Sequence, residues 1–254
     1  MAINWSGIDS QSACGRVLRM PLRLLPGGKI MTIRRGPAAG MKWIAGSAEH
    51  GCWLGTYELA KQRALDRFIR PGMTIYDIGA QAGFYSLFFS RLVGTGGTVY
   101  AFEPCPYEAR HLLDHIQMNA VQNVHVIQAA VWSETGLSAL SVDRGQTQNT
   151  LCADGNSLLR VPTLSLDGLG LPPPDLIKMD VEGAESAVLT GAAQMLHDQR
   201  PIVFIALHGA DQRRICFELL SASRYAMFGL DGIRITRQIE VDEICAMPPE
   251  SNVF

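Results

Sequence analysis

The sequence predicts an α/β fold with a doubly wound, mostly parallel sheet, a C-terminal antiparallel hairpin and an N-terminal cap. Two observations predict the sheet: short β-prone segments alternate with helix-like segments after about residue 57, and most of these strand-like segments are apolar on both faces. A third observation predicts the cap, because glycine and proline interrupt residues 1–56 too often for long regular elements. We therefore expect a cap over residues 1–56 and a larger domain over residues 57–254.

The individual elements follow from apolar periodicity and from turn residues. Apolar residues at helical spacing predict a first helix over residues 57–69, which Pro71 and Gly72 end. The turn pair Asp231-Gly232 predicts the closing hairpin, with strands over residues 225–230 and 233–236. Further strands are predicted over residues 73–78, 98–102, 124–131, 161–164, 176–179 and 201–207, further helices over 84–93, 107–120, 185–196 and 213–221, polar turns over 133–136 and 143–156, and short β-like pieces of the cap over 29–34 and 42–45.

The composition argues against several classes of protein. The net charge is −2 and the positive residues are scattered, whereas a nucleic-acid or acidic-membrane binder is normally basic. No segment approaches the roughly 20 apolar residues of a membrane span, and the N-terminus makes a poor signal peptide. The six cysteines lie far apart, without the spacing of a zinc site or a disulfide framework. We expect a soluble cytoplasmic protein with no membrane or nucleic-acid partner.

The predicted strand ends nominate the residues of a ligand site. In open α/β sheets, ligands bind beyond the carboxyl ends of the strands, near the point where the strand order reverses. The first strand of the larger domain ends at Asp77, and a turn from Gly79 to Gly83 follows it. The second ends at Glu103, whose carboxylate can accept hydrogen bonds from ribose hydroxyl groups.

The spacing of the glycines separates two nucleoside cofactors. A dinucleotide turn needs G-x-G-x-x-G, so that the pyrophosphate can rest on the helix N-terminus. Here the turn is G-x-x-x-G, and the carboxylate of Asp77 would repel a pyrophosphate but suits the sulfonium and ammonium groups of S-adenosylmethionine. The pattern favours S-adenosylmethionine, and a nicotinamide-dependent oxidoreductase of the same sheet class is an alternative.

Two more strand ends supply candidate catalytic residues. The fourth strong strand ends at Asp180 and the fifth at His208, so both should face the same crevice. His208 could remove the proton of a hydroxyl group during methyl transfer. That transfer requires no metal, and we expect none. Trp43, Trp53 and Tyr57 could line the acceptor side of the crevice with flat rings.

Three motifs resemble the FkbM-type family of class I methyltransferases: residues 76–86, 100–104 and 175–185. The resemblance implies a Rossmann-like sheet, S-adenosylmethionine as cofactor and O-methylation of a sugar or natural-product hydroxyl. It implies that Asp77, Gly79 and Gly83 hold the methionine end of the cofactor and that Glu103 holds the ribose. The expected cofactor-binding residues are Tyr57, Asp77, Gly79, Ala80, Gln81, Gly83, Phe84, Glu103, Pro104, Ala130 and Asp180.

This sequence departs from the family pattern at two positions. Gln81 stands where asparagine is expected, and Ala206 stands where relatives often carry an acidic residue two positions before the histidine. The second departure removes a group that could orient His208. The expected function is therefore O-methylation of a small hydroxylated acceptor, and a methyltransferase-like binding protein without catalysis is a further alternative.

Overall fold

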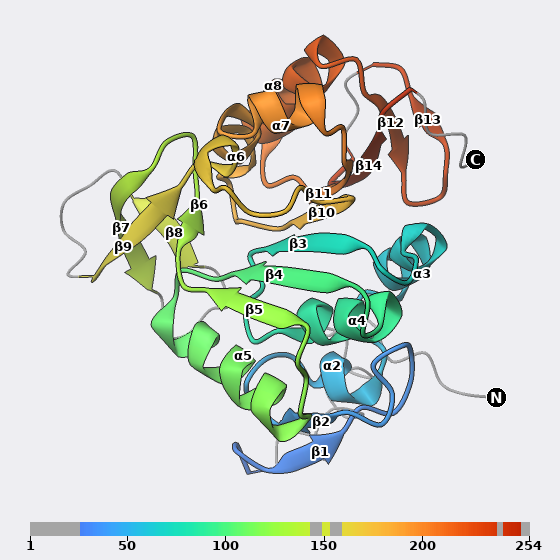
Figure 1. Ribbon diagram of the computed structural model, residues 1–254, viewed down its shortest axis with the longest axis vertical. Coiled ribbons are helices and arrows are strands. Elements are labelled where there is room, and N and C mark those ends of the chain that lie inside the picture. Colours follow the sequence, from blue (N-terminus) through green and yellow to red (C-terminus); the bar gives the residue numbers. More distant parts are fainter. Residues whose placement is uncertain (1–25, 143–148, 153–158, 238–240, 250–254) are drawn as a thin grey trace, which may run out of the picture.

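A central sheet of eight strands forms the frame of the protein (Figure 1). The computed structural model describes residues 26–142, 149–152, 159–237 and 241–249. The strand order is β13-β12-β14-β11-β10-β3-β4-β5, and the five strands from β11 to β5 are parallel. The bounds are β3 Thr74–Ile78, β4 Thr98–Phe102, β5 Val124–Ile127, β10 Leu176–Met179, β11 Ile202–Ala206, β12 Ala226–Gly229, β13 Arg234–Ile235 and β14 Glu243–Met247. The predicted doubly wound fold is confirmed.

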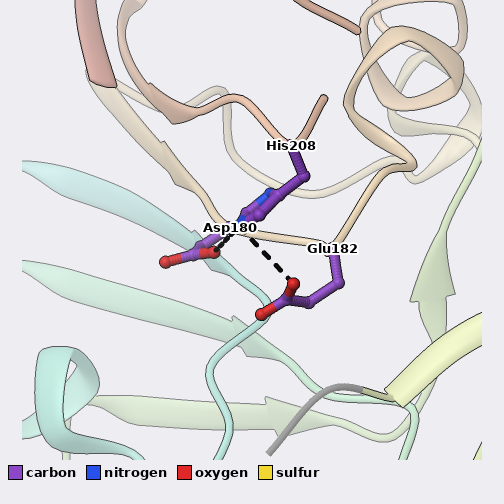
Figure 2. A group of neighbouring side chains, drawn as sticks. All are labelled: Asp180, Glu182 and His208. Carbon is purple, nitrogen blue, oxygen red and sulfur yellow. Dashed lines mark ion pairs between the residues drawn. The ribbon is translucent and has the colours of Figure 1, made fainter. Parts of the chain in front are cut away.

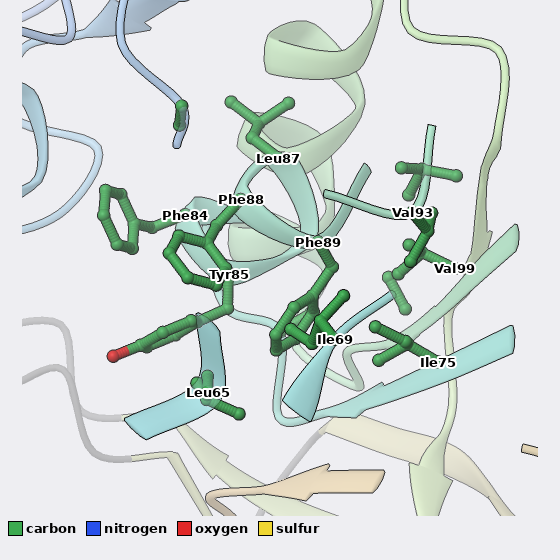
Figure 3. Packing of buried hydrophobic residues seen from close by; sticks show 14 of the residues in the cluster. Leu65, Ile69, Ile75, Phe84, Tyr85, Leu87, Phe88, Phe89, Val93 and Val99 are labelled. Atoms are coloured by element: carbon green, nitrogen blue, oxygen red, sulfur yellow. The ribbon is translucent and has the colours of Figure 1, made fainter. Parts of the chain in front are cut away.

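Helices cover both faces of this sheet (Figure 1). One face carries α3 Leu59–Phe68, α4 Phe84–Val93 and α5 Pro106–Met118, and the other carries α6 Glu185–Thr190, α7 Ala193–Asp198 and α8 Ala210–Ala222. Each face buries its own apolar cluster. In the first cluster Leu87, Phe88 and Phe89 of α4 are fully buried against the sheet (Figure 3). This packing holds the start of α4 firmly beside the end of β3.

The order of the strands reverses between β3 and β10. From β3 the chain moves outward through β4 to β5, then returns to β10 on the other side of β3. The carboxyl ends of β3 and β10 are joined directly, because the Asp180 N–H donates to the Ile78 carbonyl at 3.0 Å. Such a reversal leaves a crevice at the strand ends, which is where ligands bind in this architecture.

Several elements differ from the sequence predictions. The predicted strand over residues 124–131 divides into β5 and β6 Ala130–Val131, and β6 belongs to a separate four-stranded sheet with β7 Gly136–Val142, β8 Asn149–Cys152 and β9 Leu159–Leu164. The loop predicted over residues 143–156 was thus wrong at β8. The predicted helix over residues 185–196 divides at Gly191, where a Cβ would lie 2.1 Å from the Trp132 carbonyl oxygen. The strand β14 was not predicted, and it separates the correctly predicted hairpin of β12 and β13 from β11.

The described part of the cap lies against α5. The cap contains β1 Ile30–Thr32, β2 Lys42–Ile44 and α2 His50–Leu54, and residues 1–25 lie outside the described part of the chain. Asn119 exchanges two hydrogen bonds with the backbone of Lys42, and Nε2 of His115 accepts the Ile44 N–H at 2.9 Å. The described part of the segment expected to form the cap is therefore attached to α5 through the backbone of β2. Among the described helices, none combines the length and apolarity that a membrane span requires.

Candidate active site

The loop between β3 and α4 uses its glycines for close packing. Gly79 and Gly83 have φ angles of 75° and 92°, in the left-handed region that glycine tolerates. A Cβ on Gly79 would lie 1.9 Å from the Asp180 carbonyl oxygen, and one on Gly83 would lie 2.3 Å from Cδ1 of Leu112. Gln81 also has a positive φ, of 47°, although it is not glycine. Contacts with residues outside the loop are therefore needed to hold it in this conformation.

Glu103 is the group that holds the loop. Its side chain is buried at the end of β4, and its two oxygens accept the backbone N–H groups of Gln81 and Cys105, both at 2.8 Å. Burial raises the pKa of Glu103 to about 7, although these two hydrogen bonds act in the opposite direction. Each carboxylate oxygen has a second lone pair, so the group can accept a further hydrogen bond from a ligand.

A narrow slot of about 560 Å³ opens beside Glu103. Its walls are mostly apolar and include Pro104, Ala130 and Leu140, and the carboxylate of Glu103 stands at its edge. A flat base between apolar walls, with its ribose beside a carboxylate, suits this slot. The slot therefore fits the adenosine part of S-adenosylmethionine.

A second cavity of about 900 Å³, open to solvent, lies on the other side of the loop. Its lining includes Trp43 of β2 and Tyr57, which stands just before α3. The loop contributes Ala80, Gly83 and Phe84, among others, and the strand ends contribute Lys178, Asp180, Glu182 and His208. The two cavities share four lining residues, which are Gly79, Gln81, Asp180 and Glu182. A ligand that fills the slot would reach the larger cavity across this shared edge.

Asp77 lies one layer behind the cavity wall. It is fully buried, accepts a 2.6 Å hydrogen bond from Ser86 Oγ and lies 3.3 Å from Nζ of Lys178. The same Nζ donates to the carbonyl of Gly79 at 2.9 Å. Asp77 lines neither cavity. It acts on the loop through Lys178, which contacts both the Asp77 carboxylate and the Gly79 carbonyl.

His208 lies among three carboxylates, of which Figure 2 shows Asp180 and Glu182. Its Nδ1 is 2.7 Å from Oε1 of Glu185, and its Nε2 faces Asp180 and Glu182. The hydrogen bond to Glu185 and then the neighbouring charges raise the pKa of His208, although burial opposes them. Glu185 is fully buried at the start of α6. It therefore orients His208 in place of the acidic residue that relatives often carry at position 206.

A buried lysine stabilises Asp180 from the opposite side. Nζ of Lys61 lies 3.5 Å from Oδ2 of Asp180 and 2.9 Å from Oε2 of Glu58, and it also contacts Glu243 of β14. Burial would raise the pKa of Asp180, but Lys178 and Lys61 hold that pKa below its usual value. Asp180 is therefore ionised at neutral pH.

The structure brings most of the expected site residues to one crevice. Eleven of the twelve lie on a wall of the slot or of the larger cavity, and Asp77 lies behind the wall. Tyr57 lines the larger cavity from a turn just before α3 and not from the predicted helix. Of the three aromatic residues expected on the acceptor side, Trp43 and Tyr57 line the larger cavity, whereas Trp53 is buried beside His50. Sequence reasoning missed Lys61, Lys178 and Leu140. Of these three, only Lys178 could have been found from the sequence, because it is a charged residue inside an apolar strand.

The doubly wound fold and the two-part crevice define a class I methyltransferase. A family model, the methyltransferase FkbM domain, matches residues 77–228. The chain belongs to this FkbM methyltransferase family, and its cofactor is S-adenosylmethionine.

Other proteins are similar to parts of the chain. Ribosomal RNA large subunit methyltransferase E of Alkalilimnicola ehrlichii is 38% identical over 84 residues, which cover 33% of this chain and 35% of that protein. The chain thus spans about a third of the length of this curated relative. Two solved structures have TM-scores of 0.50: precorrin-6y C5,15-methyltransferase from Geobacter metallireducens (16% identity, 80% of this chain and 94% of that chain) and an O-methyltransferase from Thermotoga maritima (13%, 87% and 78%). At these identities the likeness supports the fold alone.

Proposed function

We propose that the protein transfers the methyl group of S-adenosylmethionine to a hydroxyl group of a small acceptor, such as a sugar or a natural product. The observation that carries the proposal is the shared edge of the two cavities. A slot shaped for adenosine meets a larger cavity at Gly79 and Asp180, so a sulfonium at this edge can present its methyl group to an acceptor.

In this proposal, the expected cofactor residues divide into three groups. Pro104 and Ala130 flank the adenine, and Glu103 accepts hydrogen bonds from the ribose. Ala80, Gly83 and Phe84 border the methionine end, with Tyr57 opposite them in the larger cavity. Asp77 acts from behind, because it holds Lys178 against the loop that the cofactor contacts. The acceptor lies beyond Asp180, toward the cap.

Catalysis then requires an acceptor oxygen in line with the methyl–sulfur bond. Holding the two reactants in that geometry supplies most of the acceleration. The oxygen–carbon bond forms, the carbon–sulfur bond breaks to leave a neutral thioether, and the proton of the hydroxyl group passes to Nε2 of His208. His208 and Asp180 are the proposed catalytic residues, since both face the acceptor side and Nε2 of His208 points away from its buried partner Glu185.

The charge of the larger cavity favours a neutral small acceptor over RNA. Glu49, Glu58, Asp180 and Glu182 line it, and the cations among its lining residues are Lys178 and the titratable His208. An acidic wall repels the phosphates of a nucleic acid. The RNA substrate named for the curated relative therefore enters as an alternative to be tested.

Calorimetric titration tests the cofactor site. We expect S-adenosylmethionine and its demethylated product to bind and NADH not to bind. Glu103→Gln should weaken cofactor binding about tenfold or more, because a hydrogen bond to a charged group contributes about 1.5–3 kcal/mol. Glu134→Gln, which changes an exposed carboxylate, is the matched control. Equal affinities for both variants would remove Glu103 from the ribose site.

A transfer assay with labelled methyl donor tests the acceptor. A panel of sugars and hydroxylated natural products is compared with ribosomal RNA fragments. Methylation of RNA alone would refute the small-molecule proposal. Cofactor binding without transfer to any member of a broad panel would favour the non-catalytic alternative.

A further inference from the structure

We propose that Asp180, Glu182 and His208 bind a divalent cation on the acceptor side of the crevice. One ligand atom of each residue, an oxygen from each carboxylate and Nε2 of the imidazole, lies within 4.8 Å of the other two. All three side chains line the larger cavity (Figure 2). The inference rests on the proposed function, because it says how the acceptor hydroxyl is activated there.

The first supporting observation is the orientation of His208. Glu185, with no exposed surface, binds Nδ1 at 2.7 Å, so in the neutral ring Nδ1 carries the hydrogen and Nε2 has the lone pair that a cation would take. Glu185 is itself fixed, because Oε1 also accepts the Gly183 N–H at 3.0 Å. A carboxylate that holds the far nitrogen of a histidine is the usual support of a metal-ligating imidazole.

The second observation is the spacing of the three ligand atoms. Nε2 lies 3.7 Å from Oδ1 of Asp180 and 3.5 Å from Oε2 of Glu182. A charge-assisted hydrogen bond would bring such atoms to about 2.7–2.9 Å. Ligands about 2.1 Å from a metal lie about 3.0 Å apart at an octahedral edge and about 3.4 Å apart at a tetrahedral one. The observed distances are too long for direct hydrogen bonds and somewhat longer than either ligand spacing, so the side chains would close slightly around a bound ion.

The third observation is the charge around the cluster. Asp180, Glu182 and Glu185 bring three carboxylates to one imidazole. The nearby Lys61 contacts the other oxygen of Asp180 and is shared with Glu58 and Glu243. Its ammonium therefore leaves Oδ1 of Asp180 available on the cavity side. A divalent cation at that point would balance the remaining negative charge.

The ligand set indicates the kind of ion and its role. Two carboxylates and one imidazole suit Mg²⁺ or Mn²⁺, which complete their shells with water. Three protein ligands leave positions open to the acceptor hydroxyl oxygen. The cation lowers the pKa of that hydroxyl, so its proton leaves to water and the oxygen attacks the methyl carbon. In this role His208 is a cation ligand, which replaces the role of proton acceptor expected from the sequence.

Manganese binding to the whole chain tests the site. Protein first freed of metal with a chelator is titrated with Mn²⁺ and followed by electron paramagnetic resonance, with and without S-adenosylmethionine. We expect one bound ion per chain in the wild type and at least about tenfold weaker binding in Glu182→Gln and His208→Ala. Glu49→Gln changes another carboxylate of the same cavity and should bind Mn²⁺ like the wild type.

The cofactor titration is repeated on each variant, which separates this inference from the proposed function. Unchanged S-adenosylmethionine affinity with lost Mn²⁺ binding supports the cation site. No Mn²⁺ binding by the wild type, or equal binding by all three variants, overturns it. Mn²⁺ binding in a protein that fails to bind S-adenosylmethionine would leave the cation site standing and refute the methyltransferase proposal.

Discussion

We predict that the stability of the fold depends on the uncharged state of His115. This residue of α5 is fully buried between the cap and the glycine loop. Its Nε2 accepts the Ile44 N–H at 2.9 Å, so Nδ1 carries the hydrogen and donates to the Ala82 carbonyl at 2.7 Å. The ring stacks on Trp43 at 3.9 Å. Protonation of Nε2 would remove the acceptor of the Ile44 N–H.

The pKa of His115 gives the size of this effect. Burial lowers it from 6.5 to about 4, although the hydrogen bond to Ala82 acts in the opposite direction. The folded pKa is below the unfolded one, so the unfolded chain binds more protons between these values. The contribution of His115 is therefore fully present above pH 6.5 and is lost as the pH falls toward 4. A difference of about 2.5 pH units corresponds to about 3 kcal/mol.

Urea denaturation between pH 7.5 and pH 4.5 measures the effect. His115→Phe keeps an aromatic ring beside Trp43 but leaves the Ile44 N–H without its acceptor, so it should lower the free energy of unfolding at pH 7.5 by about 2–4 kcal/mol. The difference between this variant and the wild type should shrink as the pH falls. His125→Phe, which changes an exposed histidine, should keep the wild-type pH dependence. A difference that stays constant over the whole range would refute the argument.

Three further predictions concern the crevice. S-adenosylmethionine should bind more tightly at pH 8 than at pH 6, because Glu103 (pKa about 7) ionises in that interval. A carboxylate accepts hydrogen bonds from the ribose more strongly than a protonated carboxyl group does. Calorimetry should find no such pH dependence in Glu103→Gln. In thermal unfolding, Gly79→Ala should lower the free energy of unfolding by more than about 2 kcal/mol, since its Cβ would overlap the Asp180 carbonyl. Gly96→Ala should be nearly neutral in the same assay, because the atom nearest to its Cβ is the Gly72 Cα at 4.0 Å. Lys61→Met should destabilise the protein by about 3–5 kcal/mol in urea, because three carboxylates lose a buried partner; a loss below 1 kcal/mol would show that water replaces the ammonium.

The sequence predicts the crevice well because strand ends converge. Glu103, Asp180 and His208 each follow an apolar strand, and parallel strands place their carboxyl ends along one edge. No knowledge of side-chain contacts is needed for this inference. The roles of the residues are harder to predict than their places. Glu185 stands at a helix start, where a carboxylate is favoured whether or not it belongs to a site, and only the fold brings it to His208.

The parts that sequence reasoning missed depend on contacts between distant segments. Lys61 lies on a helix with ordinary amphipathic spacing, and its partners come from β10 and β14. Leu140 belongs to the sheet of β6 to β9, whose strands pair in the order β6-β9-β7-β8 and not in their order along the chain. Strand pairing of this kind is decided by tertiary packing, which cannot be predicted from local strand propensity. The apolar wall of the adenosine slot could therefore not be completed from the sequence.

The attachment of β2 to α5 has a consequence for exchanging acceptor specificity between relatives. Asn119 and His115 bind backbone atoms of Lys42 and Ile44, so most of the docking does not depend on which side chains the cap carries. A transplanted cap that keeps this short strand would therefore still be anchored, while its side chains give the acceptor a different wall. Trp43 is the side chain that links the two roles, because it stacks on His115 and also lines the larger cavity. Any exchange of this segment must therefore retain or rebuild the contacts of Trp43.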